Sequence, residues 1–173
     1  MLALFKKKNP YAKAAHEVYA HILEHARKPE FYEKHGVPDT FDGRFDLMVL
    51  HAYLILHRML EEEHQEAEVF NQALFDAIFS DMDQTLREMG IGDMGVPKHM
   101  RKMMKGFNGR MHGYEAALEQ GDFTQALKRN LYGTEPEVDD KKIAQMEAKA
   151  LEMLAFLKTQ SCADILNGDV RFE

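Results

Sequence analysis

The sequence predicts an all-α protein: a single-domain helical bundle of about six to seven helices around a buried central helix. Apolar residues recur at steps of three and four along most of the chain, which is the helical period. No stretch of useful length alternates apolar and polar residues, so no sheet is expected. Residues 45–60 are apolar on almost every face, as expected of a helix that is surrounded by others.

Length and charge narrow the class of protein. A chain of 173 residues fits one domain with a substantial core. Its net charge of −7 argues against a DNA-binding protein, which is normally basic. Cys162 is the only cysteine, so no intrachain disulfide can form and a reducing compartment is expected. We also expect no signal peptide and no membrane-spanning segment, which indicates a cytoplasmic location.

The first half of the chain predicts three helices. A basic tail, residues 1–9, ends where Asn9 can cap a helix and Pro10 fits its first turn. Further on, Asp39 or Thr40 can cap the central helix. The helices expected here span residues 10–27, 29–35 and 41–65.

The second half predicts four more helical segments and one linker. Gly133 ends a short helix, and the clearest linker follows it. The helices expected here span residues 66–89, 97–120, 122–132 and 139–158. The chain is thus divided into a basic N-terminal tail (1–9), a helical core (10–133), a linker (134–138), and a C-terminal helix with a frayed tail (139–173).

Two of these helices differ in charge and meet at a glycine-rich corner. Residues 66–89 are mainly acidic and residues 97–110 are basic, and each helix carries an apolar stripe. Methionine at helical spacing usually packs in a core, but a flexible Met-rich face with a cationic rim also suits varied apolar partners or lipid headgroups. Both interpretations stay open. The second stripe consists of Met100, Met103, Met104, Phe107, Met111, Tyr114 and Leu118.

The corner matches a nucleotide-binding pattern on paper. Gly90, Gly92 and Gly95 have the G-x-G-x-x-G spacing. That pattern binds a dinucleotide only between a strand and a helix, whereas here a helix precedes it and Pro97 follows. We therefore interpret the glycines as a helix stop and turn.

Several histidines have spacings that occur in metal sites. Two helical sets could hold a metal ion, but neither has the further ligands that such sites need. Solvated or partly buried side chains explain them better, and His51 is expected to be a hydrogen-bonded core residue. Asp83 and Arg87 are expected to form a surface ion pair. The two sets are His21, Glu24 and His25, and His57, Glu61 and His64.

A group of short segments resembles the ubiquinol–cytochrome c chaperone family. The resemblance covers residues 19–133, and the order of the segments makes it specific. The segments are residues 36–46 (GVPDTFDGRFD), 74–76 (LFD), 81–83 (DMD), 87–93 (REMGIGD), 107–110 (F-x-G-R) with Tyr114, and 129–133 (RNLYG).

The resemblance implies a non-enzymatic assembly factor for the cytochrome bc1 complex, with no metal or cofactor. Mitochondrial members bind newly made cytochrome b, work with a small partner protein and associate with the ribosome. We expect no long N-terminal targeting extension of the kind that mitochondrial members have, so the chain looks like a bacterial relative. It would then act in the cytoplasm or peripherally on the inner face of the inner membrane.

Two groups of residues are candidates for function. The first group is expected to bind a partner through the shape of the corner and the charge of the basic helix. The second belongs to the family motifs and either binds or holds the fold, with Arg44 paired to a buried acid. The first group is Gly90, Gly92, Asp93, Lys98, Arg101, Lys102, Lys105, Phe107, Gly109 and Arg110. The second is Asp42, Gly43, Arg44, Asp46, Asp76, Asp81 and Asp83.

Two other functions compete with the assembly role. One is a peripheral membrane protein that binds lipid or quinone through the basic helix, which salt-sensitive binding to anionic vesicles would reveal. The other is a metal-dependent helical enzyme that uses one of the histidine sets. Stoichiometric metal in the purified protein would favour this second alternative.

Overall fold

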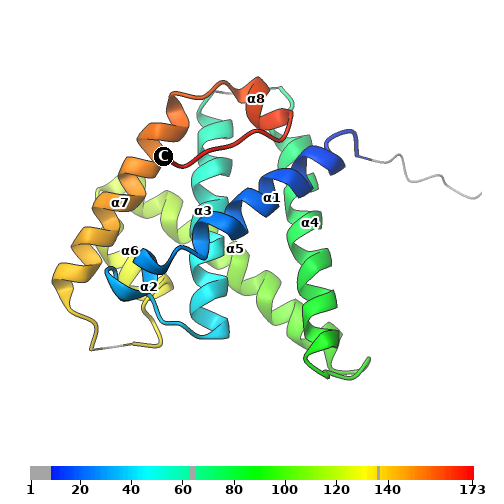
Figure 1. The fold of residues 1–173 in the computed structure, drawn as a ribbon, viewed down its shortest axis with the longest axis horizontal. Coiled ribbons are helices and arrows are strands. Elements are labelled where there is room, and N and C mark those ends of the chain that lie inside the picture. Colours follow the sequence, from blue (N-terminus) through cyan, green and yellow to red (C-terminus); the bar gives the residue numbers. More distant parts are fainter. Residues whose placement is uncertain (1–8, 63–64, 136) are drawn as a thin grey trace, which may run out of the picture.

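The computed structural model of the chain describes residues 9–62, 65–135 and 137–173 and is all-α within them (Figure 1). This confirms the predicted fold class, with one short helix more than the sequence indicated. Six of the seven predicted segments both begin and end within about two residues of the observed helices. The central helix ends four residues earlier than predicted. The helices are α1 (Ala12–Ala26), α2 (Pro29–Glu33), α3 (Phe41–Glu61), α4 (Ala67–Glu88), α5 (Val96–Gln120), α6 (Phe123–Asn130), α7 (Asp140–Lys158) and α8 (Cys162–Leu166).

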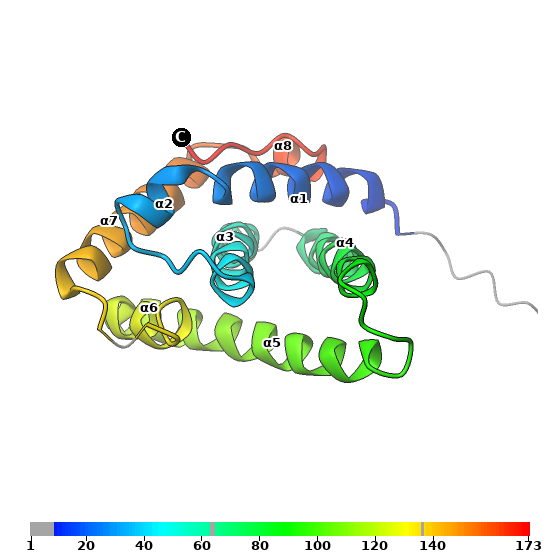
Figure 2. The same cartoon turned by 60° about the horizontal axis from the view of Figure 1, so that its bottom comes forward.

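Helix α3 is the central helix, as predicted. Figure 2 shows α3 and α4 between α1 on one side and α5 on the other. Helix α3 packs against α1, α4, α5 and α7, and Leu47, Val49, Leu50 and Ile55 are completely buried. Among the described helices, none is long and apolar enough to cross a bilayer.

The start of α3 is fixed by a cap and a close backbone contact. Thr40, one of the two predicted caps, accepts a hydrogen bond from the backbone N–H of Gly43 at 3.1 Å. A Cβ at position 43 would lie 2.0 Å from the carbonyl oxygen of Pro38. Only glycine therefore fits at position 43, which gives this family-motif residue a structural role.

The corner between α4 and α5 is a helix stop and turn, as interpreted from the glycine spacing. Gly90 follows the end of α4 with φ of +83°, a left-handed conformation that favours glycine. Arg87 pairs with Asp83 at 2.7 Å, as predicted, and also with Asp93 at 2.5 Å. Arg87 thus links the end of α4 to the turn.

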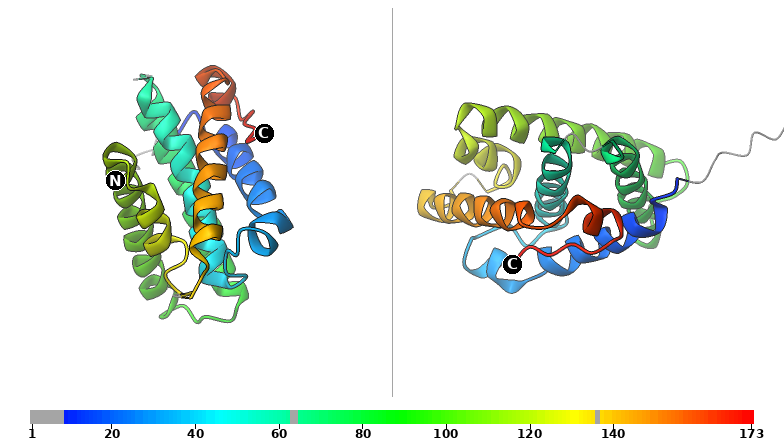
Figure 3. Two further views of the ribbon diagram at one scale, coloured as in Figure 1. Left: turned by 90° about the vertical axis from the view of Figure 1, so that its left-hand side faces the viewer. Right: turned by 90° about the horizontal axis from the view of Figure 1, so that it is seen from above.

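The prediction of a frayed C-terminal tail is wrong. After α8, residues 168–173 run alongside α1, as the right-hand view of Figure 3 shows. Val170 and Phe172 are buried, and Gln160 exchanges two hydrogen bonds with the backbone of Arg171 at 2.7 and 2.9 Å. Val170 and Phe172 lie two residues apart in a segment without helix. Their spacing does not follow the helical period, so the sequence pattern did not indicate their burial.

Candidate functional site

A groove with a volume of about 770 Å³ lies between the first turns of α3 and the N-terminal part of α5. We call it the α3/α5 groove. One end reaches the α4–α5 corner and the other reaches the end of α6. The residues that line it are Phe41, Asp42, Phe45, Asp46, Leu86, Met89, Ile91, His99, Lys102, Met103, Lys105, Gly106, Gly109, Arg110, Asn130 and Thr134.

Large apolar side chains line the groove without being covered. Phe41 is 40% exposed and Met89 is 58% exposed, while Phe45 and Met103 are half-buried. Phe41 and Phe45 are four residues apart and therefore lie on one face of α3. Such contiguous apolar surface is available for contact with another molecule.

Asp46 and Arg110 form a largely buried ion pair at the groove. Nη2 of Arg110 lies 2.7 Å from Oδ1 of Asp46, which is 4% exposed. Arg110 also donates to the carbonyl oxygens of Asn130 and Gly106, each at 3.2 Å. Burial raises the pKa of Asp46 to about 6, although the nearby Arg110 guanidinium lowers it. Arg110 thereby joins α5 to α3 and to the end of α6.

The expectation that Arg44 pairs with a buried acid is wrong. Nε of Arg44 lies 2.6 Å from Oδ1 of Asp39, and both side chains are exposed. The buried acid of this motif is Asp46, and its partner is Arg110. The two arginines could not be told apart from the sequence because the pairing depends on how α5 crosses α3.

The middle of α5 presents bare backbone to the groove. A Cβ at Gly109 would have no atom within 4 Å, so the space beside this residue is open. One turn earlier, Gly106 also lines the groove, although a Cβ there would lie 3.0 Å from Nη1 of Arg110. Another chain could therefore approach the α5 backbone closely at Gly109.

The N-terminal part of α5 carries cations that lack acidic partners. From Val96 to Tyr114 the sequence has no Asp or Glu. Within the described ranges, four exposed cations of this stretch form no ion pair. They are Lys98, Arg101, Lys102 and Lys105. The groove consequently has a positively charged rim on its α5 side.

The structure brings only part of the predicted residues to the groove. Gly90, Gly92 and Asp93 lie in the corner, and Lys98 and Arg101 lie on α5 outside the lining. The predicted residues that do line the groove are Asp42, Asp46, Lys102, Lys105, Gly109 and Arg110.

Phe107 is not a surface residue, which corrects its assignment to direct partner binding. It is 3% exposed, and its ring packs edge-on against Phe75 and Phe79 at centroid distances of 5.6 and 5.5 Å. Phe107 belongs to the apolar stripe of α5, for which the sequence left both core packing and partner binding open, and the structure places it in the core.

The acids of α4 lie away from the groove. Asp76 accepts a hydrogen bond from Gln72 at 2.7 Å, and Asp81 accepts one from the Tyr19 hydroxyl at 2.8 Å. The bond from Tyr19 attaches α4 to α1. None of Asp76, Asp81 and Asp83 lines the α3/α5 groove.

The methionine stripe of α5 combines the two roles that the sequence left open. Met100, Met103, Met104 and Met111 pack against the core but stay partly exposed. Met103 also lines the groove. Sequence reasoning missed Phe41 and Phe45 as groove residues, although their spacing on either side of Asp42 was a usable signal.

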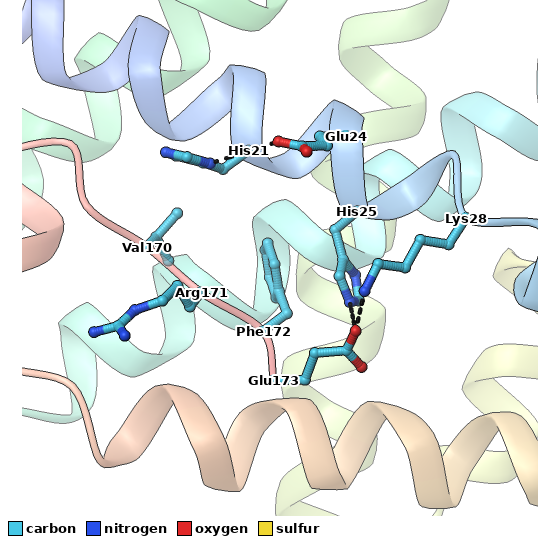
Figure 4. Close-up of a pocket in the computed structure, with 8 residues that line it drawn as sticks. All are labelled: His21, Glu24, His25, Lys28, Val170, Arg171, Phe172 and Glu173. Atoms are coloured by element: carbon cyan, nitrogen blue, oxygen red, sulfur yellow. Dashed lines mark hydrogen bonds and ion pairs between the residues drawn. The ribbon is translucent and has the colours of Figure 1, made fainter.

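The first histidine set does not converge (Figure 4). His51 is fully buried, as expected of a core residue, and its Nδ1 lies 2.8 Å from the carbonyl oxygen of Leu47. Nδ1 must therefore carry the proton, so Nε2 of His51 accepts a bond from Nδ1 of His25 at 2.9 Å. His25 stacks on Phe172, whereas His21 is exposed and lies 4.0 Å from Glu24. Burial lowers the pKa of His25 to about 3 and that of His51 to about 4.

The second histidine set is also tied into the fold. Nδ1 of His57 lies 2.9 Å from Glu115, and Glu61 pairs with Lys158 at 2.8 Å. His64 lies outside the described residues. In the part of the chain that the structure describes, no group of three or more His, Cys, Asp or Glu side chains is arranged to hold a metal ion.

Fold and site together define a helical protein with an open groove that is lined by apolar side chains and has a cationic rim. A sequence model of the ubiquinol-cytochrome C chaperone family matches residues 33–172, and the chain belongs to that family. The family recognised from the sequence segments is thus confirmed.

Individual relatives agree with this assignment. The chain is 28% identical to ubiquinol-cytochrome-c reductase complex assembly factor 1 of Xenopus laevis, over 91% of this chain and 79% of that protein. It is 26% identical to the mitochondrial protein CBP3 of Saccharomyces cerevisiae, over 82% of this chain and 44% of that protein. The chain spans about half the length of the mouse and human assembly factors.

A solved structure has the same fold. The crystal structure of the Cbp3 homolog from Brucella abortus is 36% identical and has a TM-score of 0.77. The similarity covers 96% of this chain and 93% of that chain.

Proposed function

We propose that this protein is a non-enzymatic assembly chaperone for ubiquinol–cytochrome c reductase. It binds newly made cytochrome b, or another subunit of the bc1 complex, in the α3/α5 groove. The observation that carries this proposal is that exposed apolar side chains and unpaired cations share one open groove. Relatives that are named as assembly factors for the same complex support it.

The groove has the properties that a holding chaperone needs. Its methionine and phenylalanine side chains can cover apolar segments of a client, and thioether side chains adapt to different shapes. Its unpaired cations, Lys102 and Lys105, contribute long-range attraction and increase the association rate. Holding a client in this way requires no bond to be made or broken.

The place of action in this proposal is the cytoplasmic side, peripherally at the inner face of the membrane. Anionic lipid headgroups there attract exposed lysines by about 1 kcal/mol each. A contact with the ribosome and with a small partner protein also belongs to the proposal, as the family resemblance implies.

The test is deletion of this protein from its own cell. We expect haem-loaded cytochrome b, measured by its difference absorption spectrum in membranes, to fall and to be restored by the wild-type chain. A chain with Lys102→Glu and Lys105→Glu should not restore it. A control with Lys34→Glu and Lys141→Glu, two exposed lysines outside the groove, should restore it fully. Normal haem-loaded cytochrome b in the deletion strain would refute the assembly role.

A second candidate function is peripheral binding of lipid or quinone. It is favoured by Met94, which is 96% exposed at the α4–α5 corner and precedes Lys98 and Arg101 in the sequence. Apolar side chains beside cations are typical of proteins that lie on anionic membranes. Co-sedimentation with phosphatidylglycerol vesicles should then be lost with Met94→Ser, a change that leaves the groove intact.

A further inference from the structure

The α3/α5 groove has a length, a floor and a charge that together restrict what can occupy it. We infer that it binds an amphipathic helix of about three turns whose polar face carries carboxylates. This inference rests on the proposed function, because it names the class of client segment that the same groove takes.

The length follows from the residues of α5 that line the groove. They run from His99 to Arg110, which are eleven residues apart in the helix. At 1.5 Å per residue this part of α5 is about 17 Å long. A helix of about three turns lying along α5 has the same length.

The floor favours a helix over a single inserted side chain. Gly109 leaves the α5 backbone open, so a bound helix can approach it closely. Phe41 and Phe45 line the opposite side on α3, and Met103 lies on the α5 side. An apolar helix face would therefore contact side chains from both helices at once.

The charge of the rim decides the polar face of the occupant. Lys102 and Lys105 are exposed and form no ion pair within the described ranges, and His99 lies on the same helix. The charge of Asp46 is already matched by Arg110 at 2.7 Å. Asp42 is the remaining acid of the lining. The unmatched charge is positive, so carboxylates on the occupant complement it.

A membrane surface shares the attraction to lysines but not the fit. Lipid headgroups form a layer that can reach the exposed Lys102 and Lys105 without entering the space beside Gly109. A change at Gly109 therefore separates the two occupants, because it fills the groove and leaves the cationic rim in place.

The experiment measures binding of fluorescein-labelled synthetic helices to the full chain by fluorescence anisotropy. Three peptides of fourteen residues are compared: an amphipathic helix with Glu on its polar face, the same helix with Lys in place of Glu, and a scrambled form of the acidic peptide. We expect the acidic helix to bind at least about tenfold more tightly than either of the others.

Two groove variants and two controls locate the binding. Lys102→Glu with Lys105→Glu, and separately Gly109→Leu, should each weaken binding of the acidic helix by about tenfold. The controls are Lys34→Glu with Lys141→Glu, and Asn108→Leu, which is exposed on α5 beside Gly109 but outside the lining. Both controls should bind like the wild type. If circular dichroism shows that Gly109→Leu does not fold, the double variant Lys102→Glu with Lys105→Glu alone tests the inference.

Three results would overturn the inference. The first is equal or tighter binding of the basic helix. The second is full binding of the acidic helix by a folded Gly109→Leu chain. The third is binding to phosphatidylglycerol vesicles that depends on Lys102 and Lys105 but not on Gly109, with no binding of the acidic helix. In each case the assembly role is judged separately by haem-loaded cytochrome b in cells.

Discussion

The two halves of α5 belong to one continuous helix but differ in the contacts that they make with the rest of the fold. In the C-terminal half, Tyr114 is fully buried and Glu115 accepts hydrogen bonds from Tyr53 and His57, both at 2.9 Å. In the N-terminal half, Lys102 and Lys105 have no acidic partner among the residues that the structure describes, and Met103 is only partly covered.

This difference indicates which part of the helix serves the fold and which part is free for a partner. Charges that stabilise a structure have neighbours that match them, as Glu115 does. Exposed charges without a match contribute little to folding, so Lys102 and Lys105 are not needed for the stability of the fold. The boundary between the two halves lies at Arg110, whose ion pair with Asp46 joins α5 to α3 at the groove.

The largest expected effect is at this boundary. Arg110→Ala should lower the free energy of unfolding by about 3 kcal/mol, because it leaves Asp46 buried without a counter-charge. Arg101→Ala, on the exposed side of the same helix, should change it by less than about 0.5 kcal/mol. Urea denaturation followed by circular dichroism measures both. Equal effects of the two changes would contradict the assignment of Arg110 to the fold.

A smaller difference in stability should distinguish changes in the C-terminal half of α5 from changes in its N-terminal half. Glu115→Ala removes the acceptor for Tyr53 and His57 and should cost about 1 kcal/mol. Lys105→Ala in the N-terminal half should leave the free energy of unfolding within about 0.5 kcal/mol of the wild type. If Lys105→Ala were the more harmful change, the division of α5 would be wrong.

A pH dependence should arise from Asp46. Burial raises its pKa to about 6 from 3.8, so the folded chain takes up a proton as the pH falls through 6, before the unfolded chain does. Between pH 7 and pH 5 the wild type should therefore gain stability relative to Asp46→Asn, on the order of 1 kcal/mol. Urea midpoints of both chains at the two pH values test this. Parallel changes in the two chains would show that Asp46 does not titrate in this range.

The smallest effect is a gain in stability at the groove itself. Gly109→Ala should raise the free energy of unfolding by about 0.5 to 1 kcal/mol, since alanine favours a helix and its Cβ would enter open space. Gly43→Ala should have the opposite effect and lower the free energy of unfolding, because its Cβ would clash with the carbonyl oxygen of Pro38. A loss of stability with Gly109→Ala would mean that the space beside it is already filled in solution.

The sequence predicted most of the fold because the local signals agreed with the packing. The apolar character of residues 45–60 indicated the central helix, and the glycines after α4 indicated the turn. The packing of the C-terminal residues 168–173 alongside α1 was not predicted. Their burial comes from contacts of Val170 and Phe172 with distant helices and not from any local period.

The site was predicted less completely, for a related reason. Charge patterning identified Lys102, Lys105 and Arg110 on α5, and the groove contains all three. The facing residues Phe41 and Phe45 belong to α3, far away in the sequence. Their four-residue spacing was a local signal for one apolar face, but which face of α3 lies opposite α5 is decided by tertiary packing.

The tight contact between Gly43 and Pro38 has a consequence for how the groove can respond to a guest. The contact and the Thr40 cap hold the backbone of the first turn of α3 in place, so the α3 side of the groove changes little in position. Across from it, the unbranched thioether of Met103 can change its rotamer at low energy. In the proposed function, clients of different shape would therefore be accommodated by movement of the Met103 side of the groove, while the α3 side keeps its position.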